Sequence, residues 1–552
     1  MKDRRAIGAF LIWISFFVLV SSPWAQEPGN PFRIGLVQDW TQHHIVFTRD
    51  GLMKNPGLVY SEPRIVHQAM QRWQSARPQI SGNDSIVDSL AEPQRDWNVP
   101  LGLGRIAPNM FPAKYSFDPS AAPDCTNDYV VFGLNHLGNA SQANIIAFNK
   151  LYSGAGPGIC GATNPAVMFA YNISTVTAGR ILTSPALSLN GKKIAFVESG
   201  NVGGTTRSIF HVLTWATGPG NGTSATAPAV PGVGNSASMT SLTFAAPLDT
   251  RSSPWIDYNS DIAYVGADNG KVYKITGVFK GTPTLAGAPW PVNLSPNKML
   301  SSPVLDNRLG LVMVGSANGS FYSINATTGA VKSLVIGVSA GTNPGIRAPA
   351  IVDVTNGTSF VVSSNDGTSG VLVEVDSATM TILTKGRIGL ASKSGTPINL
   401  FQPAFSNDYF TSPSLGVARL CGTGANDITP YQYAFGFTGI TMNAAPVSSS
   451  QLLTSTTAEC TGWTEFFNPN VGAGGTDFFF FGLTAECAGA GTSGCVQARN
   501  ANGSLLSSFN TTGGPSGIVV DNFSTAAQAS SIYFTGATTP NTAYKLTQNG
   551  LQ

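Results

Sequence analysis

Side chains suited to acid–base or metal chemistry are few in this sequence, and they do not gather into a familiar active-site pattern. His43 and His44 are adjacent, just after Asp39-Trp40, and histidine is the side chain that titrates near neutral pH. Adjacent residues on a strand point to opposite faces, so these imidazoles would not hold one ion together. We expect structural roles for both and assign no catalytic or metal-binding residue. The other histidines stand alone in the sequence: His67, His136 and His211.

Three short motifs match the letters of known sites without the structural context that such sites need. Asp257–Asp261 offers oxygen ligands at alternating positions, but Ile262 stands where an EF-hand calcium loop needs glycine. Gly337–Gly341 matches the Gly-x-Ser-x-Gly nucleophile motif, yet a loop pattern follows it instead of a helix. Gly156–Gly161 has the glycines of a dinucleotide fingerprint, again without a following helix. We expect turns and loops at all three.

Aromatic residues recur in two further patterns. Asp39-Trp40 and Asp96-Trp97 repeat an Asp-Trp pair, which favours a hydrogen-bonded corner covering the end of the fold. The alternative is a sugar-binding surface, on which tryptophan would stack. Phe478–Phe481 is a run of four phenylalanines, and we expect a buried strand there, because an exposed run would promote aggregation.

One unit of short strands recurs along the chain. Ser302–Leu305 leads into the apolar strand Leu311–Gly315, a polar turn ending at Gly319 and a second strand. The same order begins at Ser253 and includes the turn Asp268–Gly270. A recurrence of roughly 40–50 residues with several strands per unit is typical of a β-propeller. Asn-Gly in the turns supplies positive φ and needs no functional explanation.

Eight such units can be placed, with seven as the alternative. Two later units lack the entry proline and begin near Trp463 and Ser516. Gly218–Gly234 is rich in small residues and is expected to be an inserted loop. A β-sandwich or β-helix is disfavoured by the order and the length of the repeat. The other six units begin at a proline that follows a small residue or its equivalent: Pro112, Pro185, Pro254, Pro303, Pro349 and Pro403.

Residues 1–25 have the features of a signal peptide. Basic residues precede the apolar run Ala6–Val20, and Ala25 is a plausible cleavage point. An uncleaved anchor helix is the alternative, although the run is short for a membrane span. No later stretch qualifies as a transmembrane helix. We therefore expect an exported protein, in the periplasm, at the cell surface or outside the cell.

The rest of the chain divides into an N-terminal segment, residues 26–111, and the propeller, residues 112–552. In the N-terminal segment, Ser61 can cap a helix whose apolar face includes Ile65 and Trp73. A propeller ring needs its last blade joined to its first. We expect the strand at Arg33–Val37 or the one at Ile45–Phe47 to complete the final blade.

Six cysteines fit an exported protein, and their even number indicates disulfides. Metal binding is disfavoured because no Cys-x-x-Cys occurs. Fifteen pairings are conceivable, and proximity in the sequence favours three: Cys125–Cys160, Cys421–Cys460 and Cys487–Cys495.

Composition narrows the classes of partner. Only 11% of residues are charged, and the formal net charge is +2. No Lys/Arg-rich run appears after the first residues, so nucleic acid is excluded as a partner.

The unit Ser302–Val331 resembles the blades of quinoprotein-type propellers, through its Gly turn, its Tyr-containing strand and the Thr328-Gly329 turn. Asn325 and Ser333 stand where that family's blade-docking motif has Asp and Trp. The resemblance implies the propeller fold. The chain is also similar to long secreted bacterial propeller proteins of unassigned activity, through Arg95–Trp97, Phe111–Tyr115 and Thr183–Ser188.

The resemblance does not extend to the quinone site. Pyrroloquinoline-quinone dehydrogenases of that family carry adjacent cysteines and a carboxylate–amide calcium site. Here no two cysteines are adjacent, and no acidic cluster can be placed. We expect no cofactor, neither pyrroloquinoline quinone nor calcium.

These observations predict an all-β propeller of eight, alternatively seven, four-stranded blades with a short helix-containing N-terminal segment. The expected function is a binding or scaffold module, with a carbohydrate or protein ligand at the central face. The alternatives are a propeller enzyme, either quinoprotein-like or a polysaccharide hydrolase or lyase, and a purely structural envelope protein. Catalytic residues remain unassigned.

Overall fold

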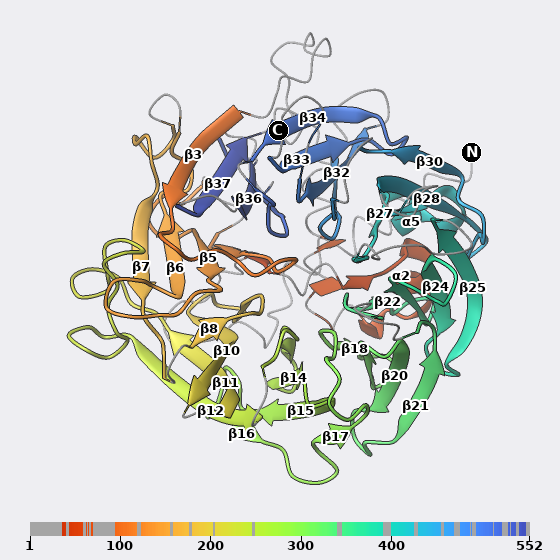
Figure 1. Cartoon of the computed structure of the whole chain (residues 1–552), viewed down its shortest axis with the longest axis horizontal. Coiled ribbons are helices and arrows are strands. Elements are labelled where there is room, and N and C mark those ends of the chain that lie inside the picture. The colour runs from red at the N-terminus through yellow and green to blue at the C-terminus, as the bar shows by residue number, and fades with distance from the viewer. Residues whose placement is uncertain are drawn as a thin grey trace.

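The computed structural model shows eight sheets arranged as a ring, antiparallel except for one parallel pair in blade 5 (Figure 1). It describes residues 36–547 apart from 40–43, 59–61, 63, 66–67, 70–93, 119–122, 155–157, 176–178, 203–204, 246–248, 339–344, 390–398, 424–428, 454–457, 469–474, 486, 488–492, 512, 522–527, 530 and 537–539. The signal peptide and most of the helix expected after Ser61 lie outside the described residues. The prediction of an eight-bladed propeller is confirmed.

Within each blade the strands follow chain order from the channel outward. Blade 1 holds β4 (Ala113–Ser116), β5 (Tyr129–Gly133), β6 (Ile145–Asn149) and β7 (Ala166–Tyr171); blade 2 holds β8 (Arg180–Ile181), β9 (Ala186–Leu187), β10 (Lys193–Val202), β11 (Thr205–Thr214) and β12 (Ser238–Ala245); blade 3 holds β13 (Trp255–Asp257), β14 (Ile262–Gly266), β15 (Lys271–Thr276), β16 (Thr284–Leu285) and β17 (Val292–Asn293); blade 4 holds β18 (Val304–Asp306), β19 (Leu311–Gly315), β20 (Ser320–Asn325) and β21 (Val331–Val335).

The second half of the ring repeats this plan. Blade 5 holds β22 (Ile351–Asp353), β23 (Thr358–Ser363), β24 (Gly370–Asp376) and β25 (Thr381–Ile388); blade 6 holds β26 (Ala404–Phe405), β27 (Val417–Thr423), β28 (Pro430–Thr438), β29 (Thr441–Met442) and β30 (Ser448–Gln451), with the short helices α5 (Asn407–Thr411) and η2 (Pro413–Leu415); blade 7 holds β31 (Thr464–Asn468), β32 (Thr476–Leu483), β33 (Cys495–Arg499) and β34 (Leu505–Asn510); blade 8 holds β35 (Val519–Asp521), β36 (Ser531–Gly536) and β37 (Thr542–Thr547).

The strand that completes blade 8 is β3 (Gln94–Pro100), which pairs antiparallel with β37. The expectation that Arg33–Val37 or Ile45–Phe47 completes this blade is wrong. Those segments contain β1 (Leu36–Gln38) and β2 (Ile45–Val46), which pair with the innermost strands of blades 1 and 5. Both are short and buried, as suits the channel, whereas β3 exposes Arg95 and Asn98 as an outer strand does.

The Ser-Pro entries form a hydrogen-bonded belt that joins consecutive blades near the channel. Phe111 N donates to Ser184 Oγ (2.9 Å), Ser184 N to Ser253 Oγ (2.9 Å), and Ser253 N to Ser302 Oγ (2.8 Å). Each hydroxyl therefore satisfies a buried amide of the preceding blade, which explains why serine recurs at this position.

A second hydroxyl, one residue earlier, fastens the entry to its own blade. Ser252 Oγ accepts from Gly266 N (2.8 Å), and Ser301 Oγ accepts from Gly315 N (2.9 Å). Thr461 Oγ1 accepts from Gly482 N (2.8 Å) in blade 7. Each of these amides ends or nearly ends the second strand of its blade, so the entry segment is held at a fixed height.

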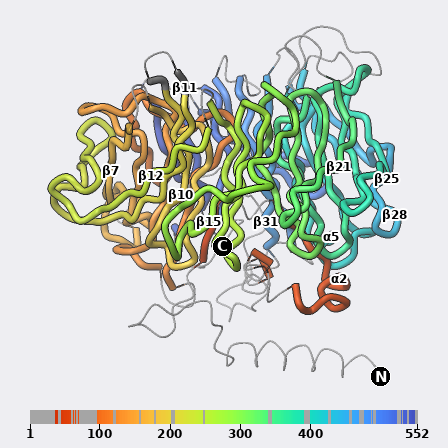
Figure 2. The backbone as a smooth tube through the Cα atoms, turned by 90° about the horizontal axis from the view of Figure 1, so that it is seen from below, coloured from red at the N-terminus to blue at the C-terminus, as the bar shows by residue number. Residues whose placement is uncertain are grey.

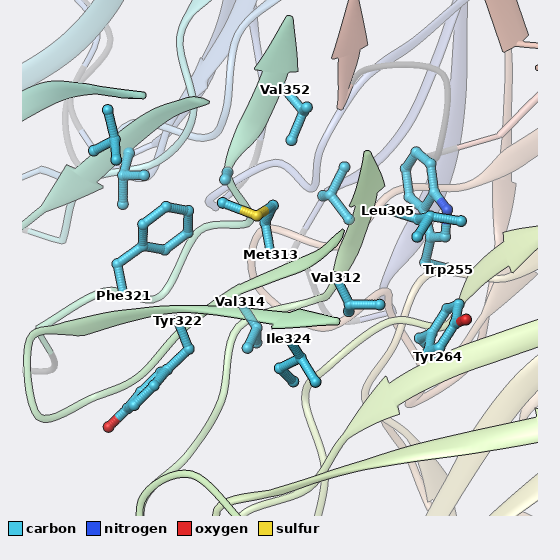
Figure 3. Close-up of a cluster of buried hydrophobic side chains, with 14 of the residues drawn as sticks. Trp255, Tyr264, Leu305, Val312, Met313, Val314, Phe321, Tyr322, Ile324 and Val352 are labelled. Carbon is cyan, nitrogen blue, oxygen red and sulfur yellow. The ribbon is translucent and has the colours of Figure 1, made fainter. Parts of the chain in front are cut away.

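Apolar side chains fill the space between neighbouring blades (Figure 3). Trp255, Leu305 and Val352 come from the innermost strands of blades 3, 4 and 5, and Phe321 packs farther out from β20. Ile45 of β2 belongs to the same buried cluster. The N-terminal segment is therefore part of the propeller core.

The inserted loop expected at Gly218–Gly234 lies between β11 and β12 of blade 2. It covers the outer edge of blade 1, because Ala170 N donates to Asn221 O (2.8 Å) and Asn172 N donates to Ala229 O (2.9 Å). An uncovered edge strand would be a template for aggregation.

The three expected disulfides are confirmed: Cys125–Cys160, Cys421–Cys460 and Cys487–Cys495. The first lies within blade 1 and the third within blade 7, while the second links β27 of blade 6 to the entry of blade 7. The described residues include no helix long and apolar enough to cross a membrane.

Glycines provide the turn geometry that the repeats require. Gly270, Gly319 and Gly367 have φ of 76°, 85° and 104°, values that side chains with a Cβ rarely adopt. The expectation for these turns is confirmed. Phe478–Phe481 lies in β32 and is fully buried, also as expected.

We expect Ser253→Ala to lower the free energy of unfolding by about 1–3 kcal/mol, because the buried Ser184 N–H would lose its acceptor. Chemical denaturation would measure the change. Ser333→Ala, at an exposed position on β21, is the control and should have almost no effect. An equal loss in both variants would contradict a stabilising belt.

Glu374 makes the stability of the fold depend on pH. Its carboxylate is fully buried in β24 and accepts from Met442 N (2.7 Å), and burial raises its pKa to about 7. Because the folded-state pKa lies above the unfolded one, the folded state holds the proton more tightly. Stability therefore falls as the pH rises from about 5 to about 7.

We expect Glu374→Gln to remove this contribution, so that the variant gains about 2–3 kcal/mol over the wild type between about pH 5 and about pH 8. Unfolding measured across that range tests the expectation. Asp50→Asn, at an exposed site in the N-terminal segment, should leave the profile unchanged. A wild-type profile that rises or stays flat would refute the argument.

Candidate functional site

The two ends of the central channel differ. The first-to-second strand turns of the blades lie at one end, together with α2 (Arg49–Lys54), and Figure 2 shows α2 and α5 at the same face of the ring. We call this the plug end. The connections that lead into the innermost strands lie at the opposite end, which we call the mouth.

The described part of residues 36–65 lies at the plug end, and we call it the plug segment. Within it, β1 pairs with β4 of blade 1, and Gln38 Nε2 donates to Val520 O of blade 8 (2.6 Å). On the far side of the channel, β2 pairs in parallel with β22 of blade 5. One short segment thus bridges blades on opposite sides of the ring.

Asp39 connects the plug segment to two further blades. Its Oδ2 atom accepts from Leu187 N of blade 2 (3.1 Å) and from Tyr258 Oη of blade 3 (3.2 Å). The carboxylate is fully buried. The aspartate of the first Asp-Trp pair is therefore structural, while Trp40 lies outside the described residues.

Arg64 is the most deeply embedded cation of the plug segment. Its guanidinium lies 3.8 Å from the centroid of the Trp255 ring, pairs with Glu62 (3.0 Å) and donates to Ile256 O. Burial raises the pKa of Glu62, and the charge of Arg64 opposes that rise. His44 is fully buried and packs edge-on against Trp255 with ring centroids 6.2 Å apart, while His43 lies outside the described residues.

A set of charged residues surrounds the mouth, and we call it the rim. Each lies in or beside a connection that leads into an innermost strand or at the turn next to it. Arg251 stands three residues before Pro254 of blade 3, Arg347 two residues before Pro349 of blade 5, and Glu459 two residues before Thr461 of blade 7. Asp249 and Asp268 belong to blade 3, where Asp268 N donates to Asp249 O (3.1 Å).

The rim residues influence one another electrostatically. Burial raises the pKa of Asp268 to about 6, a rise that Arg251 and Arg347 oppose and Asp249 favours. Burial, followed by the charge of Arg251, lowers the pKa of Arg347. These partly desolvated charges interact more strongly than solvated ones would.

Two neighbours hold the outer carboxylates of the rim. Arg180 pairs with Asp249 (3.3 Å), and Asn399 donates to Glu459 through its backbone N (3.2 Å) and its Nδ2 (2.5 Å). Below them, Met110 Sδ lies 3.4 Å from Ser253 Oγ and 3.6 Å from Ser184 Oγ, at the level of the serine belt. The mouth therefore combines a rim of both charge signs with the half-buried Met110 beside the serine belt.

This arrangement suits recognition of charged groups. Arginine guanidinium groups bind carboxylates and phosphates directionally, and Asp249 and Glu459 can accept hydrogen bonds from amines or guanidinium groups. Among the residues that the structure describes, no group of three or more His, Cys, Asp or Glu can hold a metal ion. No described histidine belongs to the rim.

The other motifs from the sequence have structural environments where they are described. Asp257 accepts from Asn259 N (3.0 Å) in the β13–β14 turn, and Asp261 there has a φ of 55°. Trp97 Nε1 donates to Leu151 O (3.0 Å). Asp96 pairs with Lys545 of β37 at 2.6 Å, so it bonds to a distant strand and not within a local corner. Ser339–Gly341 and residues 155–157 lie outside the described residues.

The rim was not anticipated from the sequence. Its residues come from blades 3, 5 and 7, and apart from Asp249 and Arg251 they are well separated in the sequence. One signal existed: in a chain with few charges, an arginine stands shortly before two of the repeated entry prolines, Arg251 three residues before Pro254 and Arg347 two residues before Pro349.

Comparisons with known proteins show similarity of the overall fold only. No protein-family model and no curated protein sequence matches the chain. Among solved structures, BamB from Moraxella catarrhalis is 14% identical, with a TM-score of 0.45 over 82% of this chain and 99% of that one. Sqt1 from Saccharomyces cerevisiae is 10% identical, with a TM-score of 0.48 over 82% and 99%. The WD40 domain of Toxoplasma gondii coronin is 11% identical, with a TM-score of 0.38 over 65% and 78%.

These values carry no argument about activity, and the fold assignment rests on the strand pairing within the chain itself. The resemblance to quinoprotein-type blades is confirmed as far as the propeller architecture.

We expect Arg64→Ala to loosen the plug segment, because Glu62 would remain buried without its partner, at a cost of about 3–5 kcal/mol. Hydrogen exchange followed by mass spectrometry should show faster exchange at Ile45 and Val46. Lys54→Ala, exposed in the same segment, should change nothing. Unaltered exchange at β2 in a destabilised Arg64→Ala protein would contradict the assigned role.

Proposed function

We propose that the protein is a binding scaffold that docks a protein partner at the mouth of its channel. The observation that supports this proposal is the asymmetry of the channel: the plug segment bonds to blades on opposite sides of one end, and the rim lies at the other end. Asp39 and Arg64 fix the plug segment through buried bonds, so a ligand would have to break these bonds to replace it. The mouth is the end left for recognition.

A protein partner fits the rim better than a carbohydrate does. Sugar sites use exposed aromatic rings for stacking, and each tryptophan in the described part of the chain is at most 9% exposed. The rim instead presents arginines and carboxylates, which match the side chains of a folded loop or an extended peptide. The tryptophans concerned are Trp97, Trp215, Trp255, Trp290 and Trp463.

Export is part of this proposal. The three disulfides fit a protein that resides in an oxidising compartment. The segment 1–25 supports the same destination through its basic start and apolar run. The proposed partner is thus met in the periplasm, at the cell surface or outside the cell, and no cofactor takes part.

Selection of binding peptides tests the proposal. A phage-displayed library of random peptides would be panned on the wild-type protein, and the affinity of selected peptides compared with that for Arg251→Ala/Arg347→Ala. We expect a loss of about tenfold or more, because two guanidinium groups would be missing from the rim.

The matched control is Lys54→Ala/Lys332→Ala, which removes the same charge from exposed sites away from the mouth. It should bind as the wild type does. Peptides that bind all three proteins equally would overturn the proposal. A glycan array that yields binders sensitive to the rim variant, where peptides yield none, would replace the protein partner with a carbohydrate.

A further inference from the structure

Three polar side chains, from the strands β10, β11 and β12 of blade 2, form a continuous hydrogen-bonded chain. Ser241 of β12 lies directly opposite His211 of β11, and His211 reaches diagonally to Glu198 of β10. His211 Nδ1 is 2.9 Å from Ser241 Oγ, and His211 Nε2 is 2.9 Å from Glu198 Oε2. A hydroxyl, an imidazole and a carboxylate in this order are the parts of an activated serine nucleophile.

The carboxylate fixes the protonation pattern of the imidazole. Glu198 is fully buried and also accepts from Thr175 N (3.1 Å) and Thr175 Oγ1 (2.6 Å). When ionised, the carboxylate only accepts hydrogen bonds, so a neutral His211 beside it would donate through Nε2 and leave Nδ1 without a proton. The Nδ1 lone pair then accepts from the Ser241 hydroxyl and can remove its proton.

The backbone is shaped to enclose the carboxylate. A Cβ atom at Gly179 would lie 1.7 Å from Glu198 Oε1, so only glycine lets the chain pass at this point. The enclosure keeps water from the carboxylate, and in such a setting its charge stabilises an imidazolium strongly.

The three residues differ in their exposure to solvent. Glu198 and His211 are fully buried, whereas Ser241 is exposed. The base His211 is thus shielded from bulk water, whereas the hydroxyl group of Ser241 is accessible from solvent. Since β12 pairs only with β11 among the described strands, alternate N–H groups along it point away from the sheet. Such edge groups are donors for an oxyanion that forms beside the strand.

We propose that Ser241 is the nucleophile of a second site, which hydrolyses carboxylic esters. Ser241 Oγ attacks the ester carbonyl carbon while its proton passes to His211 Nδ1. The ester C–O bond breaks, and the leaving alkoxide takes that proton as an alcohol. Water then attacks the acyl-serine, its proton passes to Nδ1, and the proton returns to Ser241 Oγ as the carboxylic acid departs.

In this scheme Ser241 and His211 touch the reacting atoms, and Glu198 is a positioning residue. The site lies on the outer part of blade 2 and shares no residue with the rim. The esterase proposal can therefore be tested independently of the proposed binding function. The exposed serine on an open strand suits small or terminal acyl groups rather than a substrate that needs a deep pocket.

A fluorophosphonate probe tests the assignment on the full-length protein, with intact mass and peptide mapping as readouts. We expect one adduct, on Ser241, and its absence in Ser241→Ala. Ser238→Ala, another exposed serine of β12, is the matched control and should label as the wild type does. Hydrolysis of p-nitrophenyl acetate should likewise be lost in Ser241→Ala and unchanged in Ser238→Ala.

His211→Gln should slow labelling of Ser241 by about a hundredfold or more, the usual effect of losing a general base. Glu198→Gln keeps the shape of the side chain, and we expect it to slow the labelling of Ser241 without changing the melting temperature. If Glu198 had a purely structural role, labelling would slow only together with a loss of stability. Ser241→Ala is at the surface and keeps the test valid if either buried variant fails to fold. Labelling of Ser241 no faster than that of Ser238, or labelling unaffected in folded His211→Gln, would overturn the proposal.

Discussion

Closure of the ring by β3 and β37 is the constraint on which the rest of the structure depends. Two buried ion pairs accompany it: Asp96–Lys545 at 2.6 Å within blade 8, and Lys114–Asp521 at 2.8 Å between blades 1 and 8. Burial raises the pKa of both aspartates and lowers that of Lys545, so each charge needs its partner. A closure in a wrong register would leave such a charge buried alone, at a cost of several kcal/mol. The pairs therefore penalise incorrect closure more than they add to the stability of the correct one.

Closure also determines where the N-terminal segment can go. The chain uses this segment twice: β1 and β2 line the channel, and β3 forms the outer strand of blade 8. In the described part of this segment, Asp39 and Arg64 bond to the blades at the plug end, and the charged rim lies at the mouth. The asymmetry that favours a binding function thus follows from the way the ring is closed.

The parts that sequence could predict are those set by local chemistry. Ser-Pro entries, Asn-Gly turns and alternating apolar strands recur within each blade, so blade number and order were accessible. The disulfides join cysteines that are close in sequence, and the expected pairing holds. By contrast, β3 is polar, and its partner strand is distant, since Asp96 bonds to Thr547, 451 residues away. The rim and the Ser241–His211–Glu198 chain draw residues from different strands or blades, and no spacing in the sequence reveals them.

The ring is fastened differently in its two halves. Hydroxyl groups of the serine belt join blades 1 to 4, and the plug segment pairs with blades 1 and 5 at either limit of that arc. Blade 5 has Ala348 where the belt would continue, and there Val352 N donates to His44 O of the plug segment instead (2.8 Å). Beyond it, Cys421–Cys460 links blades 6 and 7 covalently, and β3 secures blade 8. The serine belt joins only some of the neighbouring blades. In the rest of the ring, backbone hydrogen bonds, a disulfide and a terminal strand hold the blades in place.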